Sequence, residues 1–322
     1  MTKENGTFAK FGTIAVLGAG LLGGSVLLAC QKRGVAAALR AWSPSEATRR
    51  RCAGAVPEAT VTGSAQECVR GANLVLVCAP VDQIAPTLRA VAGDLAAGAL
   101  VTDVGSAKAG VCADAAEIFD AETRRRAADA VGKGAPPVPP PVFIGSHPMA
   151  GAERGGIANA SADLFAGRVC ILTPPAAEET LPAPDAGEAS PPASPVAVLR
   201  EFWRALGMRV TLLSPEEHDT IVARVSHLTH LAAAALSATL AAKPEAWRDL
   251  GGPGLRDTTR VAAGAPELWL PILAANRAEV LPALDELLAT LASVRDALAA
   301  GDFPRLEAIL RAAQCWRAAA QS

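Results

Sequence analysis

A chain of 322 residues is long for a single hydrophobic core, so about two domains are expected. Apolar residues make up 51% of it and charged residues 19%, a composition typical of globular proteins. The formal net charge of −2 leaves no basic footprint for a nucleic acid and no polybasic segment for a membrane surface. Small anionic substrates remain possible, because a few local arginines can bind them whatever the net charge.

The cysteines and the N-terminal sequence indicate in which cellular compartment the protein is expected. Seven scattered cysteines without a CxxC pair favour reduced thiols over a disulfide framework or a zinc site. The opening segment, MTKENGTFAKFG, lacks the apolar core of a signal peptide. The longest uncharged stretch, 225–242, is rich in alanine and interrupted by two histidines, which predicts a buried helix rather than a membrane span. We therefore expect a cytoplasmic protein with neither a membrane nor a nucleic-acid partner.

In the first half of the chain, short aliphatic runs alternate with helical patterns. Strands are expected at 13–17, 38–42, 74–79, 100–103, 142–144, 169–172 and 209–213, and helices at 21–33, 84–95 and 108–128. Strands separated by helices of this length predict a parallel, doubly wound sheet. Two proline-rich tracts, 134–141 and 174–195, are expected to be solvated insertions.

The pattern changes at Ser214. The segment SPEEHDTIVARV has a proline in its first turn and two acids near the positive end of the helix dipole, which predicts the start of a helix. No convincing strand follows it. The expected fold is therefore an α/β domain of residues 1–213, with a Rossmann-type doubly wound sheet, followed by an all-helical domain of residues 214–322.

The segment TIAVLGAGLLGGS carries a GxGxxG pattern between a predicted strand and a predicted helix. Gly18 permits a tight turn, Gly20 lets the backbone approach a pyrophosphate, and Gly23 lets the helix pack close to the sheet. This context favours a dinucleotide site over a structural turn. The expected cofactor-binding residues come from this loop and from neighbouring strand ends: Gly18, Gly20, Leu21, Leu22, Gly23, Ser43, Arg49, Ala79, Pro80 and Asp103.

The choice between NAD and NADP depends on the residue about 20 positions after the third glycine. Ser43 stands there, where an acidic residue would bind the ribose 2′-hydroxyl of NAD. Hydroxyl and arginine side chains at 43–49 could instead bind the 2′-phosphate of NADP, although the arginines at 49–51 also fit the solvated face of a helix. The expected cofactor is NAD or NADP, with a slight preference for NADP.

Two polar loops follow strands at the edge where open α/β sheets bind ligands. VTDVGSAKAGV carries Asp103, Ser106 and Lys108, and FIGSHPMAGAERGG carries His147. An imidazole with an ordinary pKa of about 6.5 could take a hydroxyl proton while a hydride leaves the same carbon for a nicotinamide. From residue type alone, His147 could equally cap a turn.

The helical half adds polar candidates. His227 and His230 are three residues apart and share a helix face. Because only His218 could complete a metal-binding set, no metal site is expected, and the pair is better explained as lining a cleft or as satisfied core histidines. Further on, Arg260 could bind a carboxylate and Asp257 could orient a guanidinium, although a surface ion pair explains them as well.

Five segments in this order, GAGLLGGS, DVGSAK, GSHPMAGAERGG, HDTIVARVSHLTH and GLRDTTRVA, resemble the prephenate/arogenate dehydrogenase family of tyrosine biosynthesis. The resemblance spans about residues 13–280. It implies a Rossmann domain and a helical dimerisation domain with the active site between them, and hence a homodimer. The implied reaction is the NAD(P)-dependent oxidative decarboxylation of prephenate to 4-hydroxyphenylpyruvate, or that of arogenate by a cyclohexadienyl dehydrogenase. No room is left for a regulatory or mutase domain, so a stand-alone enzyme is expected.

The resemblance also implies roles for single residues. His147 would be the catalytic histidine, bonded to the ring hydroxyl of the substrate, and Ser106 would help to orient that hydroxyl. Arg260 would bind a substrate carboxylate. The other expected substrate-pocket residues are His230, His227, Glu153 and Asp257.

Two other functions are compatible with a Rossmann domain joined to a helical one. A β-hydroxyacid-type dehydrogenase would need a catalytic lysine in the helical half, where Lys243, in AAKPE, is the one lysine after residue 213. A non-catalytic dinucleotide sensor would not need Ser106, His147 and Arg260 together.

Overall fold

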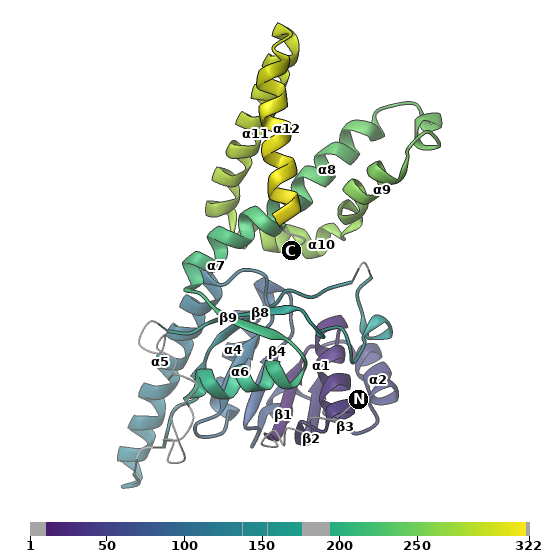
Figure 1. Ribbon diagram of the computed structural model, residues 1–322. Coiled ribbons are helices and arrows are strands. Elements are labelled where there is room, and N and C mark those ends of the chain that lie inside the picture. The colour runs from purple at the N-terminus through teal and green to yellow at the C-terminus, as the bar shows by residue number, and fades with distance from the viewer. Residues whose placement is uncertain (1–10, 137, 153, 176–193, 320–322) are drawn as a thin grey trace, which may run out of the picture.

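The computed structural model describes residues 11–136, 138–152, 154–175 and 194–319, arranged as two stacked parts (Figure 1). The lower part is a sheet covered by helices on both faces, and the upper part is helical throughout its described residues. The predicted fold class, a Rossmann-type α/β part followed by a helical part, is confirmed.

Six parallel strands form the main sheet, in the order β3-β2-β1-β4-β5-β6. Its strands are β1 (Phe11–Leu17), β2 (Ala36–Trp42), β3 (Ala59–Val61), β4 (Leu74–Val77), β5 (Leu100–Asp103) and β6 (Val142–Phe143). The strand order reverses between β1 and β4, and open α/β sheets bind ligands at such a point. The register pairs Leu17 with Trp42 and with Val77, so these three strands end at the same edge.

Helices cover both faces of this sheet, which explains why its strands are aliphatic rather than alternating. The helices of this part are α1 (Leu21–Arg33), α2 (Glu46–Ala55), α3 (Ala65–Val69), α4 (Val81–Val91), α5 (Ala109–Gly132) and α6 (Pro195–Ala205). Every residue of β4 is buried. The cluster on one face includes α1 and α6, whose Phe202 and Trp203 are fully buried, and the cluster on the other face includes α3, α4 and α5.

A second, three-stranded sheet departs from the single parallel sheet that the sequence predicts. It contains β7 (Gly145–Pro148), β8 (Val169–Thr173) and β9 (Arg209–Leu212), with β7 antiparallel to β8. The predicted strand at 142–144 ends after two residues, and the chain passes through Ile144 into β7. The N–H of Ser146 then donates to the Asp103 carboxylate at 3.1 Å instead of to a carbonyl of β5, so the chain leaves the main sheet.

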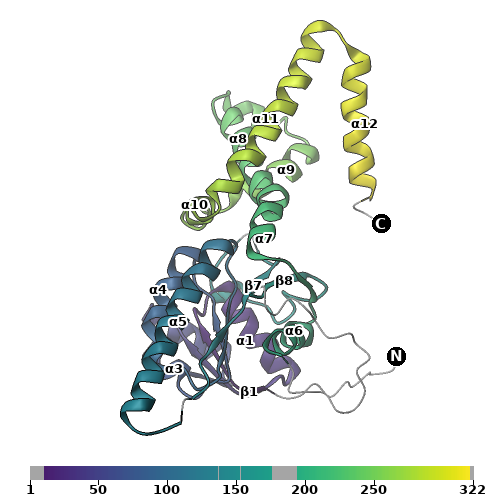
Figure 2. The same cartoon turned by 90° about the vertical axis from the view of Figure 1, so that its left-hand side faces the viewer.

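The helical part rises above this second sheet (Figures 1 and 2). Its elements are α7 (Pro215–Val222), a π-helical turn η4 (Ala223–His227), α8 (Leu228–Ala241), η5 (Glu245–Arg248), α9 (Pro253–Thr259), η6 (Arg260–Ala263), α10 (Pro266–Ala275), α11 (Arg277–Ala300) and α12 (Phe303–Ala319). Ser214 caps α7 in a capping box with Glu217. In Figure 2, α12 folds back beside α11 and stands apart from the remaining helices.

The expectation of a buried helix over 225–242 is wrong for the single chain. Only His230 and Ala233 are buried on α8, and Leu236 is 37% exposed. Length and composition alone would let the run Pro215–Ala241 cross a bilayer, a test that core helices also pass. The reason for the exposure is that the described helical part has a very small core of its own, built on Ala223, Val280 and Ala283.

The two proline-rich tracts differ in how much of them is described. The described residues of 134–141 connect α5 to β6 without regular structure. Most of the tract at 174–195, from residue 176 to residue 193, lies outside the described residues.

Candidate active site

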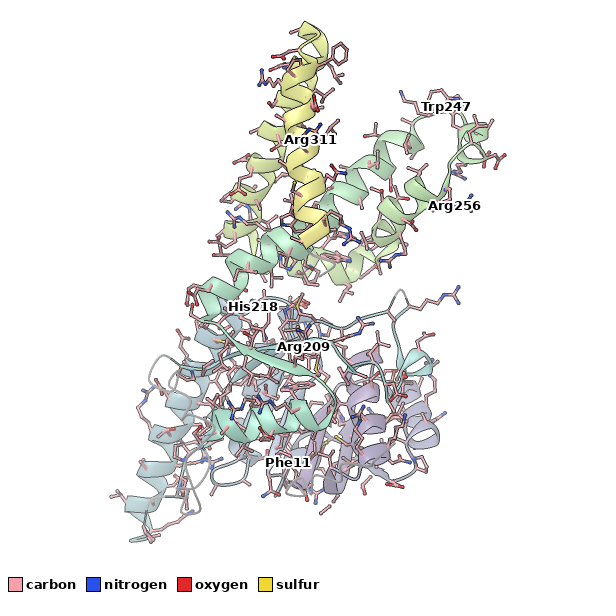
Figure 3. The ribbon with its side chains drawn as sticks, viewed as in Figure 1. Phe11, Arg209, His218, Trp247, Arg256 and Arg311 are labelled. Atoms are coloured by element: carbon pink, nitrogen blue, oxygen red, sulfur yellow. The ribbon has the colours of Figure 1, made fainter. Side chains whose placement is uncertain are left out.

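The candidate site lies where the carboxyl ends of the strands meet the underside of the helical part. Figure 3 shows His218 at this junction, on α7, directly above the layer of strands. Three segments converge there: the loop after β5, strand β7, and the run from α7 to η4. Contacts between α5 and α7 and between β8 and α7 hold the two parts together.

His147, the predicted catalytic residue, lies on β7 and is buried, with 8% of its surface exposed. Its Nδ1 is 2.8 Å from Nε2 of His218. Nδ1 of His218 is in turn 2.8 Å from Oδ1 of Asp219. The three side chains therefore form a buried chain that joins the two parts across 71 residues of sequence.

Asp219 is anchored by the start of α5. Its Oδ1 accepts the backbone N–H of Lys108 at 2.7 Å, and its Oδ2 accepts that of Ala109 at 2.9 Å. Burial alone would raise the pKa of this carboxyl, but the hydrogen bonds from His218 and the two amides outweigh it and lower the pKa below its ordinary value. The carboxylate is thus ionised at neutral pH. Asn276 fixes the backbone of the same residue, because its Nδ2 donates to the Asp219 carbonyl at 2.8 Å.

A buried ion pair between the end of β5 and the start of α5 holds the backbone of β7. Asp103 and Lys108, both with fully buried side chains, form a salt bridge, and Nζ of Lys108 also donates to the Ser146 carbonyl at 3.0 Å. The carboxylate of Asp103 further accepts the N–H groups of Ser146 and Gly105. Although Asp103 was predicted to bind the cofactor, its side chain has no exposed surface to offer one. The pair instead holds the residue that precedes His147.

The protonation of His147 follows from these surroundings. Burial lowers the pKa of its imidazole well below 6.5, and the adjacent His218 ring and then the positive charge of Lys108 lower it further. The ring is therefore neutral at physiological pH. Since Nδ1 is engaged by His218 and Nε2 makes no hydrogen bond to a described residue, Nε2 is the nitrogen left for a substrate.

Ser106 lies half-buried in the loop between β5 and α5. Its hydroxyl makes no hydrogen bond to a described residue, and its backbone neighbours His227. The structure thus places Ser106 in the same loop as Lys108, whose N–H binds Asp219.

His227 is the last residue of the π-helical turn, a feature frequent at functional sites, and His230 lies in the first turn of α8. Burial lowers the pKa of His227 to about 4, its Nδ1 is 3.2 Å from Nδ2 of Asn276, and its buried Nε2 has no described hydrogen-bond partner. Nδ1 of His230 donates to the Val261 carbonyl at 3.0 Å, and its ring stacks on Trp269 at 3.6 Å with an interplanar angle of 5°. Both rings are therefore fixed by their contacts and neutral at physiological pH.

The predicted arginine and its acidic neighbour lie on α9 and η6. Arg260 and Asp257 are exposed. Arg260 begins η6, next to Val261, whose carbonyl bonds His230. The structure thus places Arg260 next in sequence to the residue that holds the ring of His230. Glu153, another expected pocket residue, lies outside the described residues.

The glycine loop has the geometry that a dinucleotide requires. Gly18 has φ +106°, and a Cβ there would collide with the Cys78 carbonyl, so only glycine fits. A Cβ on Gly23 would collide with the Gly18 carbonyl, which shows how closely α1 approaches β1. Gly20 caps α1 without a side-chain hydrogen bond, leaving the first amides of the helix available to a pyrophosphate. Leu21 and Leu22, which follow it, are half-buried.

The remaining expected cofactor residues line the ends of β2 and β4. Ser43 is buried, and Nη1 of Arg49 donates to its carbonyl at 2.6 Å and to the Pro44 carbonyl at 3.1 Å. Ala79 and Pro80 join β4 to α4. Within the described parts of the chain, no group of three or more His, Cys, Asp or Glu side chains could hold a metal ion.

Sequence reasoning missed several residues of this cluster. Asp219, Asn276 and Trp269 were not considered, and His218 was weighed only as a metal ligand. The adjacent His-Asp pair in the first turns of a capped helix was a visible signal, but its partner is 71 residues away.

Comparisons with known proteins agree with this architecture. The sequence profile of the prephenate dehydrogenase nucleotide-binding domain matches residues 27–125 and 135–184, and that of the prephenate dehydrogenase dimerization domain matches residues 214–312. A cyclohexadienyl dehydrogenase of Zymomonas mobilis is 30% identical over 296 residues, covering 91% of this chain and 90% of the relative. A prephenate dehydrogenase of Bacillus subtilis is 26% identical over 95% of this chain and 75% of its own.

Solved structures give the same picture. A Synechocystis arogenate dehydrogenase has a TM-score of 0.72 at 27% identity, over 95% of this chain and 98% of that one. A prephenate dehydrogenase from A. aeolicus, solved with hydroxyphenyl propionate and NAD+, has a TM-score of 0.78 at 22% identity, over 97% of this chain and 98% of that one. At that identity, the second likeness shows the fold alone.

Proposed function

The chain belongs to the prephenate dehydrogenase family, and on that premise we propose that it oxidises and decarboxylates prephenate with His147 as the base. Membership makes the protein an NAD(P)-dependent dehydrogenase, which sets aside the β-hydroxyacid and non-catalytic alternatives. The observation that supports the role of His147 is its neutral, buried imidazole, whose Nδ1 is held by His218.

In the proposed reaction, the protein aligns the substrate with the dinucleotide and accepts one proton. A bound dinucleotide would supply the acceptor for the hydride that leaves the hydroxyl-bearing carbon of the substrate. His147 accepts the hydroxyl proton at Nε2 as the ketone forms, and loss of carbon dioxide is driven by aromatisation. General base help of this kind is typically worth about 10²–10⁴-fold in rate. Ser106 would orient the hydroxyl, and Gly18, Gly20 and Gly23 would hold the dinucleotide.

Arogenate is the second candidate substrate, supported by the likeness to the cyclohexadienyl and arogenate dehydrogenases. It carries an amino group where prephenate carries a keto group, at a distance from the reacting carbon. Initial rates of nicotinamide reduction with each substrate and each cofactor test the proposal directly. Faster turnover of prephenate is expected, and no turnover of either substrate would contradict it.

Replacing Arg260 with alanine is expected to raise the KM for the substrate by about 10- to 100-fold, with a smaller change in kcat. A hydrogen bond to a charged group contributes about 1.5–3 kcal/mol, and a guanidinium that grips substrate and transition state alike acts mainly on KM. Steady-state kinetics with saturating cofactor measure this.

Arg256 gives a matched control, because it is an exposed arginine on α9 that bonds the Gly251 carbonyl. Arg256→Ala should leave the substrate KM near the wild-type value. Equal effects of the two substitutions would remove Arg260 from the site.

We infer a preference for NADP from the loop after β2. Ser43 stands there at the position where an acidic residue would bind the ribose 2′-hydroxyl of NAD, and Arg49 donates to the carbonyls of the loop. Arg49→Gln is expected to lower kcat/KM for NADP by about tenfold or more and to change it little for NAD, because NAD has no 2′-phosphate to pair with. The complementary Ser43→Asp should shift the preference toward NAD by repelling the phosphate. Kinetics with both cofactors decide, and a parallel loss for NAD and NADP in Arg49→Gln would mean that the arginine merely supports the loop.

We further infer a cytoplasmic homodimer, with a domain boundary near residue 213. Support for dimerisation comes from the small core of the helical part and from large apolar side chains that α11 and α12 expose. These side chains are Leu281, Leu288, Leu291, Leu298, Phe303, Leu310 and Trp316. Exposed apolar surface of this extent marks an interface, and the matched helical profile is that of a dimerization domain.

A further inference from the structure

We propose that Asp219, acting through His218, sets the tautomer of His147, so that Nδ1 of His147 carries the proton and Nε2 presents a lone pair to the substrate. Neither residue touches the reacting atoms in this scheme, so both are positioning residues. The use made of the lone pair rests on the proposed function, whereas the tautomer itself is a property of the folded chain.

The direction of the hydrogen bonds is fixed at the Asp219 end. Both carboxylate oxygens accept a backbone N–H, from Lys108 and from Ala109, and a backbone amide can only donate. These amides belong to the N-cap residue and the first residue of α5, where the helix dipole also favours a negative charge. Asp219 is therefore an ionised, acceptor-only group.

The acceptor role of Asp219 then determines which nitrogen donates and which accepts in the next two hydrogen bonds. Nδ1 of His218, at 2.8 Å from an acceptor-only oxygen, must donate. In a neutral imidazole the other nitrogen is then an acceptor, so Nε2 of His218 accepts. Nδ1 of His147, at 2.8 Å from it, must donate, which leaves Nε2 of His147 unprotonated.

The surroundings keep this chain intact. His218 is fully buried, and Asp219 is 3% exposed, so water does not compete for their hydrogen bonds. The capping box at Ser214 fixes the start of α7, and Asn276 bonds the Asp219 carbonyl. When His147 takes a proton at Nε2, the positive charge on its ring is stabilised through His218 by the Asp219 carboxylate. An aspartate orients the histidine of hydrolytic triads in the same way.

The most direct test is Asp219→Ala, which removes the acceptor that holds the proton on Nδ1 of His218. Asparagine is not used, because the oxygen that faces Nδ1 of His218 also accepts the Lys108 N–H, so an NH₂ group placed there would meet a donor. Without the carboxylate, either nitrogen of His147 can carry the proton. We expect kcat to fall by about 10²–10⁴-fold with little change in either KM, a loss of the kind that a wrong histidine tautomer causes in a triad. Titration of the variant with reduced dinucleotide checks that it is folded.

Nitrogen NMR reads the tautomer itself, and the chain has only four histidines to assign. With ¹⁵N-labelled histidine, wild-type protein is expected to show His147 protonated at Nδ1, and Asp219→Ala to show a proton that is no longer confined to Nδ1. A wild-type His147 with its proton on Nε2, or wild-type turnover in Asp219→Ala, would overturn the proposal. Because these spectra need no turnover, a wild-type protein inactive on prephenate and arogenate would refute the proposed function alone.

Two substitutions at His218 give a matched pair in case Asp219→Ala does not fold. In His218→Gln, the amide can accept from His147 through Oε1 and donate to Asp219 through Nε2, so the polarity is kept. His218→Leu removes both hydrogen bonds while keeping a side chain of similar volume. Retention of more than about a tenth of kcat in the glutamine variant, with a loss of 10²-fold or more in the leucine variant, is expected. Equal losses in the two would show a merely structural role.

Discussion

Replacing His147 with asparagine is expected to lower kcat by about 10²–10⁴-fold, the range that a positioned general base contributes. Asparagine keeps a polar side chain that can donate to Nε2 of His218, so the buried chain of hydrogen bonds retains a partner at this position. An amide cannot accept the hydroxyl proton, however. The KM for the dinucleotide should not change, since the loop from Gly18 to Gly23 lies on a different element. Steady-state kinetics measure both constants.

The pH dependence gives a second readout of the same substitution. Burial and the nearby positive charge lower the pKa of His147 well below 6.5, so the wild-type base form persists, and kcat/KM falls only at pH values well below 6.5. This acid limb should disappear in His147→Asn. Near-normal turnover, or an unchanged acid limb, would show that another group is the base.

The lowered pKa of His147 also makes the stability of the fold depend on pH. A histidine whose pKa is lower in the folded than in the unfolded chain binds its proton preferentially after unfolding. Its contribution to stability is therefore present above about pH 6.5 and is lost as the pH falls from there toward the folded pKa. The asparagine variant should lose this part of the acid destabilisation.

The main sheet could be predicted because its signals are local. The glycine loop and the alternation of aliphatic runs with helical patterns depend on neighbouring residues, and they indicated a parallel doubly wound sheet. The second sheet could not be predicted, because β7, with the sequence GSHP, has no strand-like alternation. It becomes a strand through pairing with β8 and through the bond from the Ser146 amide to Asp103, which are tertiary contacts.

The dependence on tertiary contacts also explains which residues of the site could be predicted. His147 and Ser106 became candidates because each follows a predicted strand at the edge where open α/β sheets bind ligands, and their roles came from the family resemblance. The partners of His147 were missed because they lie on α7, at a sequence separation of 71 residues. Asp103 was assigned to the cofactor from its position at a strand end, but a lysine five residues later takes its carboxylate into the interior. A buried ion pair of this kind cannot be distinguished by sequence from two surface charges.

Replacing Lys108 with methionine is expected to lower the free energy of unfolding by about 3–5 kcal/mol, because the substitution leaves the carboxylate of Asp103 buried without its cation. Urea unfolding followed by far-ultraviolet circular dichroism measures this. Turnover should fall as well, since Nζ of Lys108 also bonds the carbonyl of Ser146, the residue before His147. Loss of the positive charge should move the pKa of His147 upward, so that the acid limb of kcat/KM shifts to higher pH.

The surface offers a matched control in Arg89, which pairs with Asp114 at 3.2 Å while both side chains are about half exposed. Arg89→Ala should change the free energy of unfolding by less than about 1 kcal/mol, as solvated pairs do. In the double variant Asp103→Asn/Lys108→Met, neither of these two positions carries a buried charge, so part of the lost stability should return. If turnover stays low in this double variant while stability recovers, the ion pair acts on His147 through Ser146 and not merely through the fold. Full recovery of both would instead assign the pair to the fold alone.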